Sequence, residues 1–185
     1  MCYSPSCNSP REKSSREVEG RALIMRKINP QYVEAACLLA DASPYFQLLN
    51  MKLRTFDIGT SVVEILLEQR HLQPFGVVHG GVFATIIDAA AFWAVYPEVD
   101  EHVGMTSVDL KLNYLAPAVT GKLIAYGKRI RLGKTLGLGE ATVTDENGKM
   151  LAHGTSTLMV LPALAFVHKD PLPVKFLEEE RDDAL

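Results

Sequence analysis

The stretch PFGVVHGGVFATIIDAAAFWAVY, residues 74–96, limits what this chain can fold into more than any other part of the sequence. It is apolar or small almost throughout, which predicts a helix buried on nearly all sides. Pro97 follows directly and ends the helix. Because a single helix cannot bury all of its own faces, other elements must wrap around it.

Two polar features on this helix predict chemistry. The pair Gly80 and Gly81 at its start exposes backbone N–H groups that lack an intrahelical partner, and glycine lets a ligand approach closely. Asp88 interrupts the apolar run, where a carboxylate is costly unless it is paired or used. These features favour a catalytic helix. The structural alternatives are a buried acid held by backbone donors and a His79 that serves only the turn.

The segments around the helix predict further elements. Asn29 and Pro30 form a helix start, with Asn as the N-cap and Pro at the first helical position. Residues 53–68 are rich in β-branched residues on both sides of Gly59, which indicates a strand pair or a bent strand.

From residue 105 onward, apolar residues alternate with polar ones, as is typical of half-buried strands. The four predicted strands cover residues 107–114, 122–131, 135–145 and 150–161. Short turns join them, so we expect an antiparallel meander. The order predicts an α+β fold, one curved antiparallel sheet wrapped around one long central helix. The sheet edge left over is a natural site for pairing two subunits.

Length and composition predict one domain, residues 26–162, with a tail at each end of the 185-residue chain. Residues 1–25 are rich in Ser, Pro and charge, which predicts a disordered tail. For residues 163–185, a solvated tail and a short terminal helix are both consistent with an acidic end.

Charge and cysteine content narrow the function classes. A net charge of −3 and a pI near 6.0 give no electrostatic reason to expect nucleic acid or a membrane surface as partner. The apolar helix is expected to be too short to span a bilayer, which needs about 20 residues. The N-terminus lacks an apolar signal core, and three cysteines form no disulfide framework. Both features favour the cytoplasm.

The spacing on the helix has a consequence for assembly. Gly81 and Asp88 are seven residues apart, which is two turns and roughly 10 Å along the axis. One small carbonyl group therefore cannot touch both features of the same chain. If both act on one substrate, the site is built from two chains, and we predict a homodimer with composite sites.

Several motifs lie between about residue 73 and residue 162. They are Gln73, the turn His79-Gly80-Gly81, Asp88, the strand segment Thr106-Ser107-Val108-Asp109, the pair Tyr114 and Pro117, and the loop Gly133-Lys134-Thr135. Together they resemble the hotdog-fold acyl-CoA thioesterases of the PaaI type. The acid nine residues after the histidine is moderately specific, and the strand and loop motifs strengthen the match.

The resemblance implies hydrolysis of an acyl-CoA to a carboxylic acid and coenzyme A, without metal or redox cofactor. Asp88 would be either the general base that activates water or the nucleophile. Ser107 would position that water or the acid, although it is also consistent with a plain strand residue. The N–H of Gly80, with that of Gly81, would stabilise the oxyanion.

The remaining predicted site residues concern substrate orientation. The resemblance implies that His79 and Gln73 orient the thioester and the leaving thiolate; the family often carries Asn at the Gln73 position. Basic side chains on the loop, Arg131 and Lys134, suit the phosphates of coenzyme A, although surface charges usually have no specific partner. Gly133 and Thr135 complete the predicted substrate-binding loop.

Two rival functions use the same fold. An enoyl-thioester hydratase would carry an Asp followed five residues later by a His, a pattern that this sequence lacks. A regulator that binds acyl-CoA without catalysis would not need Asp88. The sequence leaves open the acyl group and the choice between a dimer and a tetramer.

Overall fold

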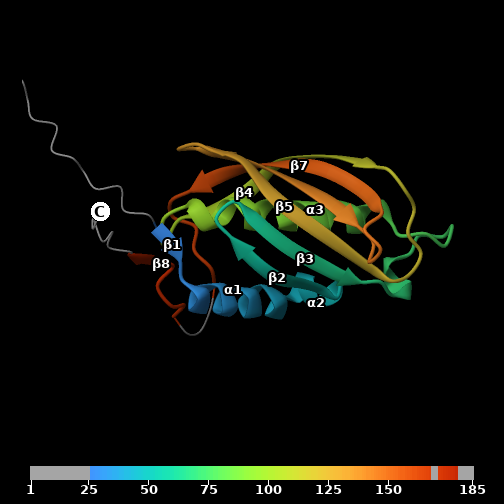
Figure 1. Cartoon of the computed structure of the whole chain (residues 1–185), viewed down its shortest axis with the longest axis horizontal. Coiled ribbons are helices and arrows are strands. Elements are labelled where there is room, and N and C mark those ends of the chain that lie inside the picture. Colours follow the sequence, from blue (N-terminus) through green and yellow to red (C-terminus); the bar gives the residue numbers. More distant parts are fainter. Residues whose placement is uncertain (1–25, 168–170, 179–185) are drawn as a thin grey trace, which may run out of the picture.

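The long apolar helix lies at the centre of the structure, a computed structural model that describes residues 26–167 and 171–178. This helix, α3 (Gly80–Val95), continues into a short 3-10 turn, η2 (Tyr96–Glu98). The large sheet curves around it, as Figure 1 shows. The predicted disordered tail, residues 1–25, lies outside the described residues, as do two of the three cysteines, Cys2 and Cys7.

Six antiparallel strands form this sheet in the order β2-β3-β5-β6-β7-β4. Their bounds are β2 (Met51–Asp57), β3 (Thr60–Leu66), β4 (Gly104–Tyr114), β5 (Lys122–Leu132), β6 (Leu136–Thr144) and β7 (Met150–Leu161). The predicted α+β architecture, a curved antiparallel sheet around a long central helix, is confirmed. The predicted strand pair around Gly59 is the β2–β3 hairpin.

The predicted meander of four consecutive strands is wrong in one respect. Strands β5, β6 and β7 form a meander, but β4 pairs with β7 rather than with β5, and β5 pairs with β3. Helix α3 connects the β2–β3 hairpin to β4 across the inner face of the sheet. The chain therefore enters β4 at the far edge, and the later strands fill the space between. Alternation predicts that a strand exists, but it does not identify the partner.

Glycines on the inner face of the sheet bring α3 unusually close. A Cβ atom on Gly127 would lie 2.1 Å from the carbonyl oxygen of Ala90, and one on Gly139 would lie 2.7 Å from that of Ala91. The hydroxyl of Ser61 also donates a hydrogen bond of 2.6 Å to the Ala90 carbonyl. The helix backbone thus rests directly on the sheet, which fixes how its polar residues are presented.

The lead helix begins as predicted. In α1 (Pro30–Ala42), the Asn29 side chain accepts a hydrogen bond from the backbone N–H of Gln31, and α2 (Pro44–Leu48) follows. Figure 1 shows α1 alongside β2, where Asp41 accepts a 2.9 Å hydrogen bond from the N–H of Leu53. This edge of the sheet is therefore covered, whereas β4 at the other edge is exposed over most of its length.

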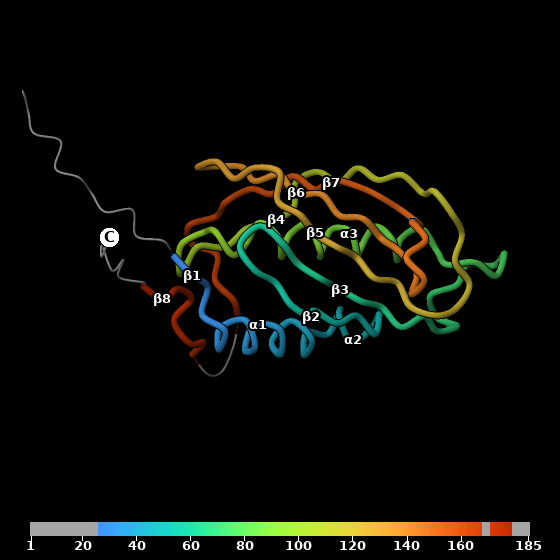
Figure 2. The backbone as a smooth tube through the Cα atoms, viewed as in Figure 1, coloured from blue at the N-terminus to red at the C-terminus, as the bar shows by residue number. Residues whose placement is uncertain are grey.

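The chain after β7 differs from the expected solvated tail or terminal helix. Its described residues end in a strand, β8 (Phe176–Glu178). This strand pairs with β1 (Arg26–Ile28), which directly precedes α1 (Figure 2). Lys175 is only 1% exposed, and its Nζ donates hydrogen bonds of 2.9 and 2.7 Å to the carbonyl oxygens of Tyr96 and Val99. The aliphatic part of the Lys175 side chain packs in the interior. Because lysine is charged, the sequence alone does not predict this burial.

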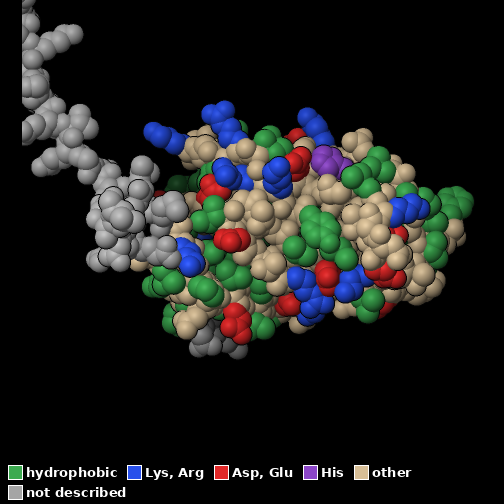
Figure 3. Space-filling model, in the orientation of Figure 1, with side chains coloured by type: hydrophobic (Ala, Val, Ile, Leu, Met, Phe, Trp, Pro, Cys, Tyr) green, Lys and Arg blue, Asp and Glu red, His purple; other side chains and the backbone are tan. Residues whose placement is uncertain are grey.

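The central helix also meets the length criterion that we expected it to miss. The continuous segment Gly80–Glu98 is 19 residues long with a mean hydropathy of 1.3, enough to cross a membrane by length and composition alone. However, 61% of that segment's most apolar window is buried inside the protein, as in a core helix. On the face shown in Figure 3, acidic, basic and hydrophobic side chains are interspersed.

Candidate active site

Asp88 is held by two serine hydroxyls. Its Oδ1 atom accepts a hydrogen bond of 2.7 Å from Ser107 on β4 and another of 2.7 Å from Ser156 on β7. The side chain is half-buried, and no described residue donates to its Oδ2 atom. One carboxylate oxygen is therefore fixed in direction, and the other is available to a water or a substrate.

The two serines reach Asp88 because of the strands on which they lie. Ser107 directly precedes a β-bulge in β4, and bulges commonly reorient side chains beside active sites. Ser156 belongs to the inward-facing set of β7, in which Gly154 and Leu158 are also buried. Sequence reasoning predicted Ser107 but missed Ser156. The signal was present: Ser156 is a polar residue in the apolar phase of an alternating strand.

The start of α3 keeps one backbone donor free. His79 is the N-cap, and its Nδ1 atom accepts a 2.9 Å hydrogen bond from the N–H of Gly81. Among the described residues, no acceptor contacts the N–H of Gly80, while the hydroxyl of Tyr114 donates to the Gly80 carbonyl at 3.3 Å. Of the two predicted oxyanion donors, Gly80 is thus available, and Gly81 is occupied by the histidine ring.

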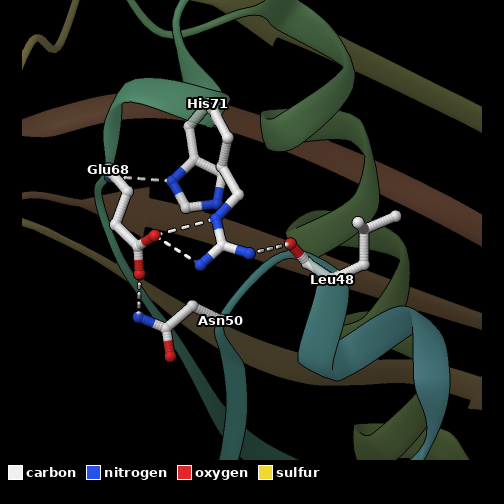
Figure 4. Close-up of polar contacts among 5 residues, drawn as sticks. Leu48, Asn50, Glu68 and His71 are labelled. Atoms are coloured by element: carbon white, nitrogen blue, oxygen red, sulfur yellow. Dashed lines mark hydrogen bonds and ion pairs between the residues drawn. The ribbon is translucent and has the colours of Figure 1, made fainter.

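A buried histidine, His71, supports the turn at the start of α3 through hydrogen bonds. His71 is 1% exposed; its carbonyl oxygen accepts the N–H of His79 at 2.8 Å, and its Nδ1 atom accepts the N–H of Glu68 at 2.9 Å. Figure 4 shows how Glu68 in turn accepts a hydrogen bond from Asn50. Glu68 also accepts one from the Nε of Arg70 at 2.8 Å. The hydrogen bond from Arg70 holds the pKa of the Glu68 carboxyl below its ordinary value. This polar cluster anchors the turn to the beginning of the sheet.

Gln73 shapes the loop before the helix through its backbone. Its N–H donates to the carbonyl of Val77 at 2.8 Å, and its carbonyl accepts the N–H of Gly76 at 2.9 Å. Gly76 has a φ of +77°, a left-handed conformation that glycine adopts without strain. The side chain of Gln73 is half-buried and bonds to no described residue, so this chain alone does not bring it to Asp88.

The predicted phosphate-binding loop lies at the other end of the helix. Its residues occupy the exposed turn between β5 and β6 and the strand end before it: Arg131, Gly133, Lys134 and Thr135. Nearby contacts place this turn beside the end of α3: Arg129 forms an ion pair with Glu98, and a Cβ on Gly137 would lie 2.7 Å from Val95. Arg131 and Lys134 form no ion pair with any described residue. Within a single chain, they lie at the opposite end of α3 from Gly80.

The helix itself separates the two chemical features. Gly80 and Asp88 are eight residues apart within α3, which corresponds to about 12 Å along the axis. The structure therefore keeps the donor and the acid of one chain too far apart for a single carbonyl group. In residues 26–167 and 171–178, no three His, Cys, Asp or Glu side chains gather into a potential metal site.

The arrangement supports a hydrolytic or acyl-transfer reaction. A fixed carboxylate with one free oxygen can accept a proton from water or attack a carbonyl carbon. A helix N-terminus with a free N–H stabilises the negative charge that develops on a carbonyl oxygen.

Comparison with known proteins agrees with this chemistry. A family model described as the thioesterase superfamily matches residues 75–152. Acyl-coenzyme A thioesterase 13 of Mus musculus is 32% identical over 98 residues, which are 52% of this chain and 69% of that protein. A 1,4-dihydroxy-2-naphthoyl-CoA hydrolase of Listeria monocytogenes is 25% identical over 114 residues, 62% of this chain and 93% of that protein.

Solved structures show the same fold. A thioesterase from Haemophilus influenzae superposes with a TM-score of 0.62 and 25% identity, covering 74% of this chain and 94% of its own. A variant of a Pseudomonas aeruginosa thioesterase gives a TM-score of 0.64 at 22% identity, with 69% and 93% of the two chains covered. The family match includes α3 and β4 to β6, and it ends at residue 152, within β7.

Proposed function

The chain belongs to the thioesterase superfamily, and from this premise we propose that it hydrolyses the thioester bond of an acyl-coenzyme A, releasing a carboxylic acid and coenzyme A. The observation that carries the proposal is the Asp88 carboxylate, which two serine hydroxyls fix on a buried helix while one oxygen stays free. The names of the mouse and Listeria relatives support acyl-CoA as the substrate class.

Asp88 acts by one of two routes. As a general base, its free oxygen takes a proton from water while the water oxygen attacks the thioester carbonyl; the C–S bond then breaks, and the thiolate leaves with a proton. As a nucleophile, the carboxylate forms an anhydride with the acyl group, expels the thiolate, and is released by water. In both routes, the N–H of Gly80 stabilises the oxyanion.

Gly80 and Asp88 of one chain lie about 12 Å apart along α3, at about 1.5 Å per residue. A site built from two subunits brings such a donor and such an acid together. We place Asp88 of one subunit opposite Gly80 of the other in a homodimer. The exposed strand β4, which carries Ser107 and Tyr114, is the sheet edge available for pairing. In this arrangement, His79 and Gln73 lie beside Gly80 and orient the thioester. Arg131 and Lys134, free of ion pairs among the described residues, bind the phosphates of coenzyme A.

The test is thiol release from a panel of acyl-CoAs, measured with a thiol reagent. We expect the wild type to release coenzyme A and Asp88→Asn to lose about 100-fold or more in kcat, because the amide is neither a base nor a nucleophile. Asp109→Asn is the matched control, since Asp109 is an exposed acid two residues from Ser107 whose one ion pair among the described residues is with Lys111.

The same panel separates the rival functions. Equal rates for the wild type and Asp88→Asn would remove Asp88 from the mechanism. Binding of acyl-CoA without thiol release would favour a regulator that binds the ligand. Loss of the double bond of an enoyl-CoA without thiol release would identify a hydratase.

A further inference from the structure

A mostly apolar cavity of about 520 Å³ lies at the C-terminal end of α3. Its volume falls within the range of small-molecule sites, roughly 300–1,000 Å³. Aromatic and aliphatic side chains dominate its walls, including Phe92, Tyr96, Met105, Phe166 and Leu172. A space of this composition accepts an apolar group and rejects a charged one.

The cavity lies next to the hydrogen-bonded pair Asp88 and Ser107, because α3 and β4 each contribute a neighbouring residue to its lining. Phe92 follows Asp88 by four residues on α3, so the two side chains share a helix face about 6 Å apart along the axis. Met105 precedes Ser107 by two residues on β4, where side chains two apart point the same way about 7 Å apart. A chain bound at Asp88 and extending along α3 therefore reaches the cavity.

The outer wall comes from the segment after β7, beyond residue 152, where the family match ends. Phe166 stacks on Trp93, with ring centroids 5.9 Å apart, and packs on Tyr96 at 5.2 Å. Leu172 lines the same space from the other part of this segment. The wall is thus an addition of this chain to the part that the family model matches.

The one buried amine in the lining does not call for an acidic ligand. Lys175 donates to two backbone carbonyls, and its Nζ lies 4.0 Å from the centre of the Tyr96 ring. Burial lowers the pKa of this amine to about 7. Its hydrogen bonds are directed at the end of the helix, so the cavity offers mainly hydrophobic contact.

We propose that this cavity holds the distal hydrophobic part of the acyl group and that residues 164–167 and 171–175 set the preference for medium-length acyl chains over acetyl. This inference rests on the proposed thioesterase function. A short acyl group ends before Phe92 and gains nothing from the cavity. A longer one buries its methylenes there, and each buried methylene raises the affinity about fourfold.

Two opposite substitutions at one position test the proposal. Leu172→Trp fills the cavity, so kcat/KM for decanoyl-CoA should fall about tenfold while that for butyryl-CoA changes less than twofold. Leu172→Ala enlarges it, and the preferred chain length should increase. Leu177→Trp is the matched control, because Leu177 is 40% exposed on β8 and outside the cavity lining. Thermal unfolding verifies that each variant is folded.

Folded Leu172 variants with the wild-type chain-length profile would overturn the inference. If the wild type hydrolyses no acyl-CoA, the proposed function fails, and calorimetric binding of 1-decanol, an uncharged chain of the same length, tests the cavity independently. Binding by the wild type that weakens about tenfold in Leu172→Trp, with Leu177→Trp unchanged, supports the cavity as an acyl site. No binding, or equal binding by all three proteins, rules it out.

Discussion

The N–H group of Gly80 is the residue-scale feature on which the proposed chemistry most depends. His79, the N-cap, occupies the next N–H, that of Gly81, so one donor remains at the helix start. His79 has an extended conformation with φ −66° and ψ 138°, which is compatible with a following proline. Proline is also well tolerated at the first helical position, where its missing N–H breaks no intrahelical bond.

Because proline fits this backbone conformation, Gly80→Pro removes the N–H donor and leaves the helix start intact. We expect Gly80→Pro to lower kcat by about 100-fold or more, because an oxyanion donor disappears. Gly80→Ala is the control: it adds the same Cβ beside the Tyr114 hydroxyl but keeps the N–H. Steady-state kinetics with one acyl-CoA compares them. Equal kcat values for the two variants would show that the N–H has no catalytic role.

At the scale of elements, the strand β8 and the residue before it lock the C-terminal segment onto the end of α3. The Nζ of Lys175 binds the carbonyls of Tyr96 and Val99, and the N–H of Asn29 donates to the Lys175 carbonyl at 2.9 Å. The segment therefore joins the start of α1 to the end of α3. The stability of this segment depends on the free-energy cost of burying the charge of Lys175.

The buried amine predicts a pH-dependent stability. Burial lowers the pKa of Lys175 from 10.5 in the unfolded chain to about 7 in the folded one. Between these values the unfolded chain binds the extra proton, so the free energy of unfolding rises with pH, by up to about 1.4 kcal/mol per unit, and its Lys175 contribution is constant below pH 7. Denaturant unfolding between pH 7 and 9.5 measures this slope.

Lys175→Met is the matched control for this experiment, because methionine keeps an unbranched apolar stem without the amine. We expect its unfolding free energy to change less with pH over the same range. Parallel curves for the wild type and this variant would show that Lys175 does not lose its proton on folding.

The whole molecule raises the question of how two distant features act on one substrate. Sheet edge β2 is covered by α1, whereas β4, next to the Asp88 site, is open. The proposed dimer would bring Asp88 of one subunit to Gly80 of the other. Each subunit would then supply half of two sites.

Mixing two inactive variants tests the composite site. In a mixed dimer of Asp88→Asn and Gly80→Pro, one site receives the intact Asp88 and the intact Gly80, and the other receives both substitutions. Co-expression with random pairing should therefore restore roughly a quarter of the wild-type activity. Co-expression of each variant with itself is the control. An isolated mixed dimer that stays inactive would place each site within one chain.

Local sequence alone determined the central helix, the N-cap Asn29 of the lead helix and the strands of the large sheet, because burial periodicity and turn residues act over short range. It also indicated Asp88, because a carboxylate in an apolar helix is costly unless it is paired or used, whereas Ser107 was predicted from the family resemblance. The pairing of β4 with β7, the second hydroxyl from Ser156 and the hydrogen bonds of Lys175 were decided only by the tertiary structure. They join residues 38 to 79 positions apart, and no local pattern encodes which distant backbone will meet a side chain.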